Sequence, residues 1–128
     1  MTTIARLGSG GPWEDVYGYC RVVSAGGFVL TAGCTATVDG VVTGVGDAGS
    51  QARTAFGIAV ESLGRAGARV DQVTRTRMYV VRPEDADAVG RAHGEIFGAV
   101  RPAATMVFVA GLLHPDMLVE VEVEAFTG

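Results

Sequence analysis

Apolar and polar residues alternate along this chain with two different periods. Runs with a period of two, or rich in β-branched residues, predict six strands. These strands cover residues 4–7, 19–24, 28–33, 73–81, 104–110 and 117–126. Ala25-Gly26-Gly27 predicts a tight hairpin turn between the second and third strands, because glycine accepts positive φ. Residues 37–42 carry a further turn with Asp-Gly at its centre.

Two other segments repeat their apolar residues every three or four positions, which predicts helices. The first covers residues 48–66, with Asp47 as its N-cap and Gly67 as its stop. Its apolar stripe consists of Ala52, Ala55, Phe56, Ala59, Val60 and Leu63. The second begins near Pro83-Glu84-Asp85, since proline and acidic residues suit a first helical turn, and it ends before Gly98.

The resulting order of elements is β-β-β-α-β-α-β-β, which predicts an α+β fold. A six-stranded mixed sheet would carry two helices on one face and leave its other face open. The 128 residues suffice for one domain, 1–128, and no linker or repeat divides them. An uncovered, partly apolar sheet face also makes symmetric oligomerisation an expectation.

The last strand predicts what the open face carries. Its alternation sends Val119, Val121, Val123 and Ala125 to the core, and Leu118, Glu120, Glu122, Glu124 and Phe126 to the open face. In residues 73–81, alternation groups Val73, Arg75, Arg77 and Tyr79 on one face, and Thr74, Thr76, Met78 and Val80 on the other. Arginines would therefore meet glutamates on the open face. Either this is a solvated or inter-subunit ion-pair surface, or one carboxylate is kept for chemistry in a cleft.

Charge and composition exclude several classes of function. The net charge is −4, and all ten basic residues are arginine, which excludes a Schiff-base lysine and a phosphate-binding loop that ends in Gly-Lys. The sequence contains no basic stripe of the kind that nucleic-acid-binding proteins show. No apolar run approaches the ~20 residues of a membrane span, and no signal peptide is visible, so the expected location is cytoplasmic.

Cysteine and histidine give little sign of a metal or redox centre. Cys20 and Cys34 form no CxxC pair and are expected to be free thiols, with Cys20 buried in a strand. His93 and His114 lie far apart without ligand spacing, so no metal site is expected. His93 is expected to play a structural or subunit-contact role.

Several segments, in this order and at these spacings, resemble the RidA/YjgF family, also labelled L-PSP endoribonuclease. They are Gly18-Tyr19-Cys20-Arg21-Val22-Val23, Val29 to Gly33, Gly46-Asp47 to Gln51, Gly67-Ala68 with Asp71-Gln72-Val73, Tyr79-Val80-Val81, Arg101-Pro102-Ala103-Ala104-Thr105, and Leu118 to Glu122. The resemblance spans almost the whole chain. It implies a chorismate-mutase-like fold and a homotrimer whose sheets line a central barrel, with a cleft at each subunit interface.

The family's activity is the hydrolysis of enamines and imines, such as 2-aminoacrylate, to 2-oxo acids and ammonia. The resemblance implies no metal and no cofactor, because an imine is already electrophilic. It places Glu120 at the position of the glutamate that handles water or a proton. Tyr19 falls at the position of the pocket tyrosine.

The chain departs from the family pattern at the residue that should bind the substrate's carboxylate. Pro102-Ala103 is followed by Ala104 where the family has an arginine, so this chain resembles the members that lack it. Ala32 also replaces a serine, and Met106 a cysteine. Arg21, two residues after Tyr19, and Arg101 are candidate substitutes; alternatively, both pair with surface or inter-subunit acids.

Three further side chains have two open interpretations each. Cys34 follows Gly33 near the expected cleft, where it either lines the substrate site or is an inert packed thiol. Trp13 and Tyr17 form either an aromatic lid over a planar ligand or a local packing cluster.

Three functions therefore remain. The first is enamine or imine hydrolysis at inter-subunit clefts. The second is a trimer that binds a small metabolite without turnover. The third is an endoribonuclease or translation inhibitor. It is disfavoured because RNA binding requires a positively charged surface, whereas the net charge is −4.

Overall fold

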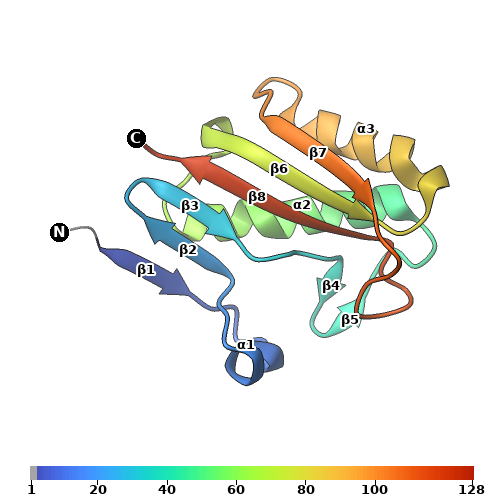
Figure 1. Cartoon of the computed structure of the whole chain (residues 1–128), viewed down its shortest axis with the longest axis horizontal. Coiled ribbons are helices and arrows are strands. Elements are labelled where there is room, and N and C mark those ends of the chain that lie inside the picture. The colour runs from blue at the N-terminus through green and yellow to red at the C-terminus, as the bar shows by residue number, and fades with distance from the viewer. Residues whose placement is uncertain (1–2) are drawn as a thin grey trace.

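Six strands form one mixed sheet in the computed structural model, which describes residues 3–128 (Figure 1). The strand order is β1-β2-β3-β8-β6-β7. The strands are β1 (Ile4–Leu7), β2 (Val22–Ala25), β3 (Phe28–Thr31), β6 (Val73–Val80), β7 (Ala103–Phe108) and β8 (Val119–Phe126). β6 and β7 pair in parallel, and the other neighbours pair antiparallel. A separate two-stranded ribbon joins β4 (Thr37–Val38) to β5 (Val41–Val42).

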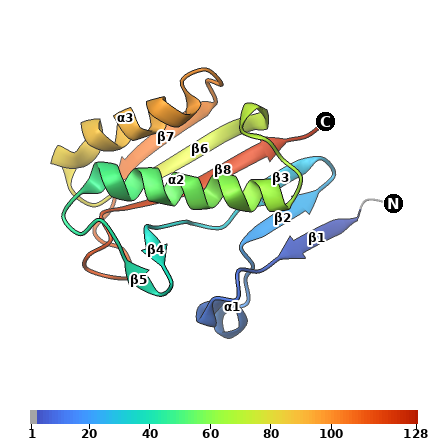
Figure 2. The same ribbon diagram turned by 180° about the vertical axis from the view of Figure 1, so that it is seen from behind.

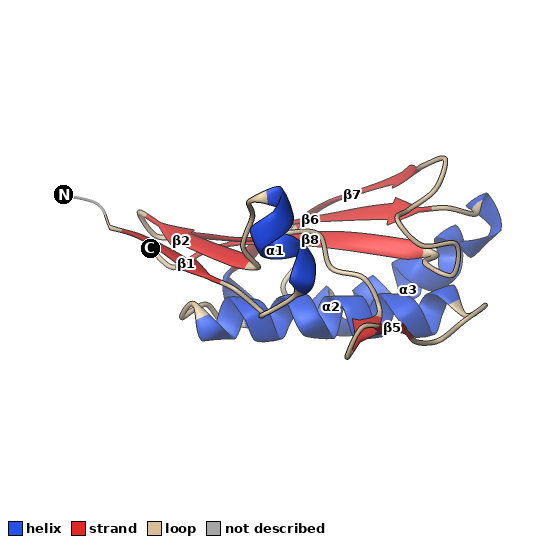
Figure 3. Cartoon of the chain, turned by 90° about the horizontal axis from the view of Figure 1, so that it is seen from below, coloured by secondary structure: helices blue, strands red, loops and turns tan. Residues whose placement is uncertain are grey.

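Two helices cover one face of this sheet, α2 (Ala48–Arg65) and α3 (Ala86–Phe97) (Figures 2 and 3). The predicted N-cap of α2 is confirmed, because the Asp47 carboxylate accepts the Ser50 backbone N–H at 3.0 Å. Short 3₁₀ turns, η1 (Val70–Gln72) and η2 (Pro83–Asp85), lead into β6 and α3. The α+β prediction, with helices on one face only, is therefore confirmed.

The core lies between the helices and the sheet. Phe56 and Leu63 of α2 and Phe97 of α3 are fully buried there. The ring centroids of Phe56 and Phe97 are 5.3 Å apart in an edge-to-face contact, the geometry that aromatic pairs prefer. From β8, Val119, Val121, Val123 and Ala125 face this layer with no exposed area.

Three residues were predicted on the wrong face. Val73 is buried and Thr74 exposed, because the β6–β8 register shifts between Val73 and Arg75, a β-bulge that resets the alternation. Leu118 is also buried rather than on the glutamate face. Leu118 lies one residue before β8, where side chains do not have to alternate between the two faces of the sheet.

The N-terminal third differs most from its prediction. A short helix, α1 (Pro12–Tyr17), lies between the first two predicted strands, where no element was predicted. Gly18 ends it at φ 77°, in the left-handed region that glycine tolerates. β2 therefore begins at Val22 rather than at Tyr19, and Cys20, predicted to be buried in a strand, is half-buried before it.

The predicted hairpin turn is confirmed at Gly26 and Gly27, which have φ of 56° and 89° between β2 and β3. No helix within residues 3–128 is long and apolar enough to cross a membrane.

Candidate functional site

The chain leaves β3 and runs beside β8 at the level of Glu120. Cys34 pairs with Val121 through two backbone hydrogen bonds of 2.8 and 2.9 Å. This bridge brings the preceding residue, Gly33, against the Glu120 carboxylate. A Cβ at position 33 would lie 2.8 Å from Cδ of Glu120, so only glycine leaves the carboxylate its present place.

Arg21 joins this segment from the other side. Its Nη1 donates to the Gly33 carbonyl at 2.6 Å and to Sγ of Cys34 at 3.6 Å. Its guanidinium carbon lies 5.9 Å from the centroid of the Tyr19 ring. Three stretches of chain thus bring Tyr19, Arg21, Cys34 and Glu120 to one place, which we call the Glu120 cluster.

The electrostatics of the cluster favour a basic carboxylate. Burial and the charge of Glu122 raise the pKa of Glu120, and the nearby Arg21 opposes this rise. Burial also raises the pKa of the Cys34 thiol, despite Arg21. A buried, protonated thiol is a poor nucleophile, so the chemistry of this cluster is that of Glu120.

A cleft of about 630 Å³ opens beside the cluster. Its walls come from β1, α1, the segment before β2, β2 itself, and β3 with the residue after it. They consist of Arg6, Glu14, Asp15, Gly18, Tyr19, Cys20, Val23, Leu30, Thr31 and Ala32. Tyr19 belongs to both the cleft and the cluster, and Ala32 immediately precedes Gly33. A small ligand in the cleft would therefore border the Glu120 cluster.

Arg101 and Ala104 lie apart from the Glu120 cluster in the structure. Ala103 pairs with Arg75, which in turn pairs with Glu124, so this end of β7 is level with Glu124 rather than Glu120. The offset is four residues along the strand, about 13 Å. Arg101 lines a separate cavity of about 240 Å³ with His93, and its Nε donates to the Gly98 carbonyl at 3.2 Å.

Ala104 also faces the wrong way to join the cluster within one protomer. It pairs with Thr76, whose hydroxyl is hydrogen-bonded to Nε2 of His93 on α3 at 2.7 Å. Ala104 therefore shares the helix-covered face of the sheet, exposed on the edge strand β7. His93 has a structural contact, as expected, and burial lowers its pKa.

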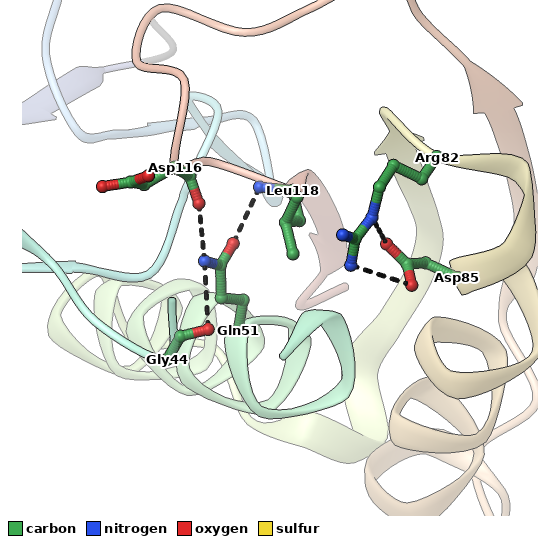
Figure 4. Close-up of polar contacts among 6 residues, drawn as sticks. All are labelled: Gly44, Gln51, Arg82, Asp85, Asp116 and Leu118. Atoms are coloured by element: carbon green, nitrogen blue, oxygen red, sulfur yellow. Dashed lines mark hydrogen bonds and ion pairs between the residues drawn. The ribbon is translucent and has the colours of Figure 1, made fainter. Parts of the chain in front are cut away.

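Two buried polar residues near the site were missed in the sequence. Gln51 lies next to Ala52 at the N-terminal end of the buried face of α2, and a polar residue at the start of the apolar stripe was the available signal. Its amide donates to the carbonyls of Gly44 and Asp116 at 3.3 and 2.8 Å, and its oxygen accepts the Leu118 N–H at 2.8 Å (Figure 4). Gln51 thereby fixes the start of β8, two residues before Glu120.

The second is Glu14, which is 8% exposed. Its carboxylate accepts the Ser9 backbone N–H at 3.1 Å and the Ser9 hydroxyl, and the hydroxyl bond is the main cause that lowers its pKa. The acidic first turn after Pro12 was the only sign of it. Glu14 thereby ties α1 to the segment that precedes it, at the wall of the cleft.

Trp13 and Tyr17 stack on each other, with centroids 5.5 Å apart and an interplanar angle of 18°. Both are exposed and neither lines the cleft. The local packing interpretation fits this arrangement within the protomer. Among residues 3–128, no group of three or more His, Cys, Asp or Glu side chains is placed to hold a metal ion.

This fold and this cluster define a class of protein, and comparison with known proteins identifies it. The profile of the family described as "Endoribonuclease L-PSP" matches residues 14–127. The chain belongs to this family, which is the RidA/YjgF family of the sequence prediction.

Relatives extend over nearly the whole chain. The uncharacterized protein SCO2049 of Streptomyces coelicolor is 44% identical over 125 residues, which cover 98% of this chain and 93% of that protein. The crystal structure of Rv2704 from Mycobacterium tuberculosis, a member of the YjgF/YER057c/UK114 family, shares 36% identity at a TM-score of 0.87, over 97% of this chain and 99% of that one.

A more distant crystal structure shows the same fold. It is that of Escherichia coli TdcF with bound serine, at 21% identity and a TM-score of 0.79, over 96% of this chain and 94% of that one.

Proposed function

We propose that this protein hydrolyses small enamines or imines to a carbonyl compound and ammonia. The observation that carries the proposal is the Glu120 cluster: a half-buried carboxylate of raised pKa beside a guanidinium and an open cleft. A carboxylate made more basic by its surroundings is suited to take a proton from water near neutral pH. Membership of the family supports the same chemistry.

The reaction needs one proton to be moved and returned. The substrate reacts as the protonated imine. Glu120 takes a proton from water as the water oxygen bonds to the imine carbon, and the electron pair of the carbon–nitrogen π bond moves to the nitrogen, which gives a neutral carbinolamine. Protonated Glu120 then gives its proton to this nitrogen, the carbon–nitrogen bond breaks as the hydroxyl oxygen forms the carbonyl, and the hydroxyl proton passes through water to the departing ammonia, which leaves as ammonium. An enamine enters this sequence after a proton adds to its β-carbon. Every step uses only water and the carboxyl group.

Arg21 is our candidate for binding an acidic substrate. Position 104 holds alanine, whereas Arg21 lies within the Glu120 cluster and contacts the backbone carbonyl of Gly33. Arg21 uses Nη1 to donate to the Gly33 carbonyl, so the N–H groups on its other nitrogens are available to a carboxylate. The Tyr19 ring beside the guanidinium would border the same ligand.

We also propose a homotrimer in which the open sheet face is covered. That face exposes apolar side chains, with Phe28, Leu30 and Phe126 each at least 40% exposed. The edge strand β7, with Arg101 and Ala104 near its start, would then border a neighbouring subunit's cleft. Light scattering at micromolar concentration tests this, and a monomer would contradict it.

A second candidate function is capture of a small metabolite without turnover. The specific observation that favours it is the fold relative TdcF, whose crystal structure holds bound serine. The cleft beside Tyr19 would bind such a ligand with Arg21 on its carboxylate and Glu120 near its amino group.

The test is release of ammonia and 2-oxo acid from an enamine generated in the assay. We expect acceleration by the native protein and a loss of 10²- to 10⁴-fold in Glu120→Gln, the usual contribution of a positioned acid–base group. Glu95→Gln is the matched control, because Glu95 lies on the outer surface and pairs with Arg53. No acceleration of acidic or neutral imines would favour the binding function.

Arg21→Gln separates the two roles within the cluster. If Arg21 binds the substrate's carboxylate, this variant raises KM for an acidic imine and leaves a neutral imine little affected. Equal losses on both substrates would contradict the role given to Arg21.

A further inference from the structure

Glutamates on β8 and side chains on β6 form a ladder across the open face of the sheet. Cross-strand geometry sets Tyr79 opposite Glu120, Arg77 opposite Glu122 and Arg75 opposite Glu124. Side chains of such directly opposed residues are the nearest neighbours on a sheet, with Cβ atoms about 5 Å apart. Direct pairing would therefore give Glu120 the Tyr79 hydroxyl as its donor.

The observed contacts run diagonally instead. Nη1 of Arg77 donates to Oε1 of Glu124 at 2.9 Å. The Tyr79 hydroxyl donates a hydrogen bond to the Glu122 carboxylate. Each β6 side chain thus passes its direct partner and reaches the next glutamate along β8.

This diagonal offset has a consequence at each end of the ladder. At one end, Arg75 makes no side-chain hydrogen bond or ion pair within residues 3–128. At the other end, the Glu120 carboxylate accepts no hydrogen bond from a side chain in the same part of the chain. Among the three glutamates of this ladder, Glu120 is the one without a side-chain donor, and it lies in the cluster with Arg21 and Gly33.

We propose that Glu122 and Tyr79 act as a positioning pair that keeps Glu120 unpaired and basic. Glu122 holds the Tyr79 hydroxyl away from Glu120, and its own negative charge favours the protonated form of Glu120. The inference deepens the proposed function, because it explains how the ladder prepares Glu120 to move a proton. The effect of Glu122 on the pKa of Glu120 is a property of the free protein and can be measured without substrate.

The surroundings of Glu120 contain few other groups that could replace this effect. Arg21 faces it from the segment before β2, and the Cys34 thiol from the segment after β3. β6 contributes Tyr79, with Arg77 beside Glu122, and β8 contributes Glu122. Arg21 favours the charged form of Glu120, so Glu122 is the neighbouring charge that favours its protonation. The bond to Glu122 is also the main cause that raises the pKa of Tyr79.

The experiment is a titration of Glu120 by NMR in full-length protein labelled with ¹³C at glutamate carboxyls. Glu120→Gln identifies the resonance by its loss. We expect Glu122→Gln to lower the midpoint of Glu120 by about 0.5 pH units, the size given by a unit charge about 7 Å away across a partly solvated surface. Glu124→Gln is the matched control, being the same change one step further along the ladder.

A second readout follows the phenol. In Glu122→Gln, ultraviolet absorbance should show Tyr79 ionising at lower pH, with Tyr79→Phe identifying its contribution. An unchanged midpoint of Glu120 in Glu122→Gln, equal to that in Glu124→Gln, would overturn the inference while leaving the proposed activity intact. Conversely, full activity of Glu120→Gln would end the proposed function, and a shifted Glu120 midpoint would still support the positioning pair.

Discussion

The two faces of the sheet are built by the same strands under different rules. On β8, the valines at alternate positions are completely buried, while the glutamates between them stay half-exposed on the open face. Figure 3 shows that α2 and α3 lie on one side of the sheet. Most positions of the covered face need only apolar side chains of suitable volume. On the open face, what matters is which side chain each carboxylate contacts.

Stability therefore depends mainly on the covered face, and chemistry on the open face. Removing a buried side chain from the covered face leaves a cavity, which costs free energy of unfolding. When a side chain is removed from the open face, water fills the space. Such a substitution should therefore change activity or assembly rather than the free energy of unfolding. Substitutions on the two faces should therefore differ in whether they change stability or activity.

Phe56→Ala should produce the largest loss of stability. Phe56 has no exposed area and contacts both Phe97 and His93. Truncation of a buried phenylalanine costs about 3–5 kcal/mol. Denaturant unfolding at one protein concentration measures this change.

Phe28→Ala is the matched control on the open face. Phe28 is 54% exposed and contacts Phe126 at 5.0 Å between centroids. We expect it to weaken association between subunits rather than the protomer, so its effect should grow on dilution. Equal, concentration-independent losses in both variants would break the distinction between the two faces.

Gln51→Leu should cost about 3 kcal/mol, although leucine suits a buried helix position. The change leaves two carbonyls and one N–H without the amide that now satisfies them, and each such buried group costs about 1–3 kcal/mol. Gln72→Leu, the control, loses one exposed bond to the Arg69 N–H and should cost under about 1 kcal/mol. A stable Gln51→Leu would show that the segment before β8 can be held by apolar packing alone.

Gly33→Ala should leave stability nearly unchanged but lower the proposed activity about 10- to 100-fold. The new methyl group would collide with the Glu120 carboxylate, which can swing aside because it ends a flexible side chain. Misplacing a catalytic group by about 1 Å can cost 10²-fold. Gly57→Ala on α2, where a Cβ meets nothing within 4 Å, is the control and should keep full activity. Full activity in Gly33→Ala would argue against a fixed position for Glu120.

These expectations show how far the sequence determines the structure. Periodicity was enough for the covered face, since the burial of Val119, Val121 and Val123 follows directly from alternation. It failed at Val73 and Thr74, because a bulge adds a residue that no pattern in a single strand reveals.

The Glu120 cluster was only partly predictable, for a related reason. The resemblance selected Tyr19 and Glu120, but the contact of Arg21 with the Gly33 carbonyl depends on how two loops meet. Gln51 stood out only as a polar residue on an apolar stripe. The diagonal contacts of the ladder depend on rotamers and register, so the sequence placed arginines opposite glutamates without saying which pairs form.

Glu120 and Glu95 should affect the pH dependence of stability with opposite signs, and this is the smallest effect that we expect. The pKa of Glu120 is raised by burial and by Glu122, so the folded state holds its proton more tightly than the unfolded state. Its contribution to stability is therefore present below the unfolded pKa and is lost as pH rises through the folded pKa. Glu95, on the outer surface, has its pKa lowered by the Arg53 hydrogen bond, so its contribution has the opposite sign.

Unfolding of Glu120→Gln and Glu95→Gln between pH 4 and 8 should separate these signs. Relative to the native protein, Glu120→Gln should gain stability as pH rises, on the order of 0.5 kcal/mol, whereas Glu95→Gln should lose a little. If Glu120→Gln instead lost stability with rising pH, Glu120 would be held as a paired ion, and the open face would be an ion-pair surface rather than a site that keeps one carboxylate for chemistry.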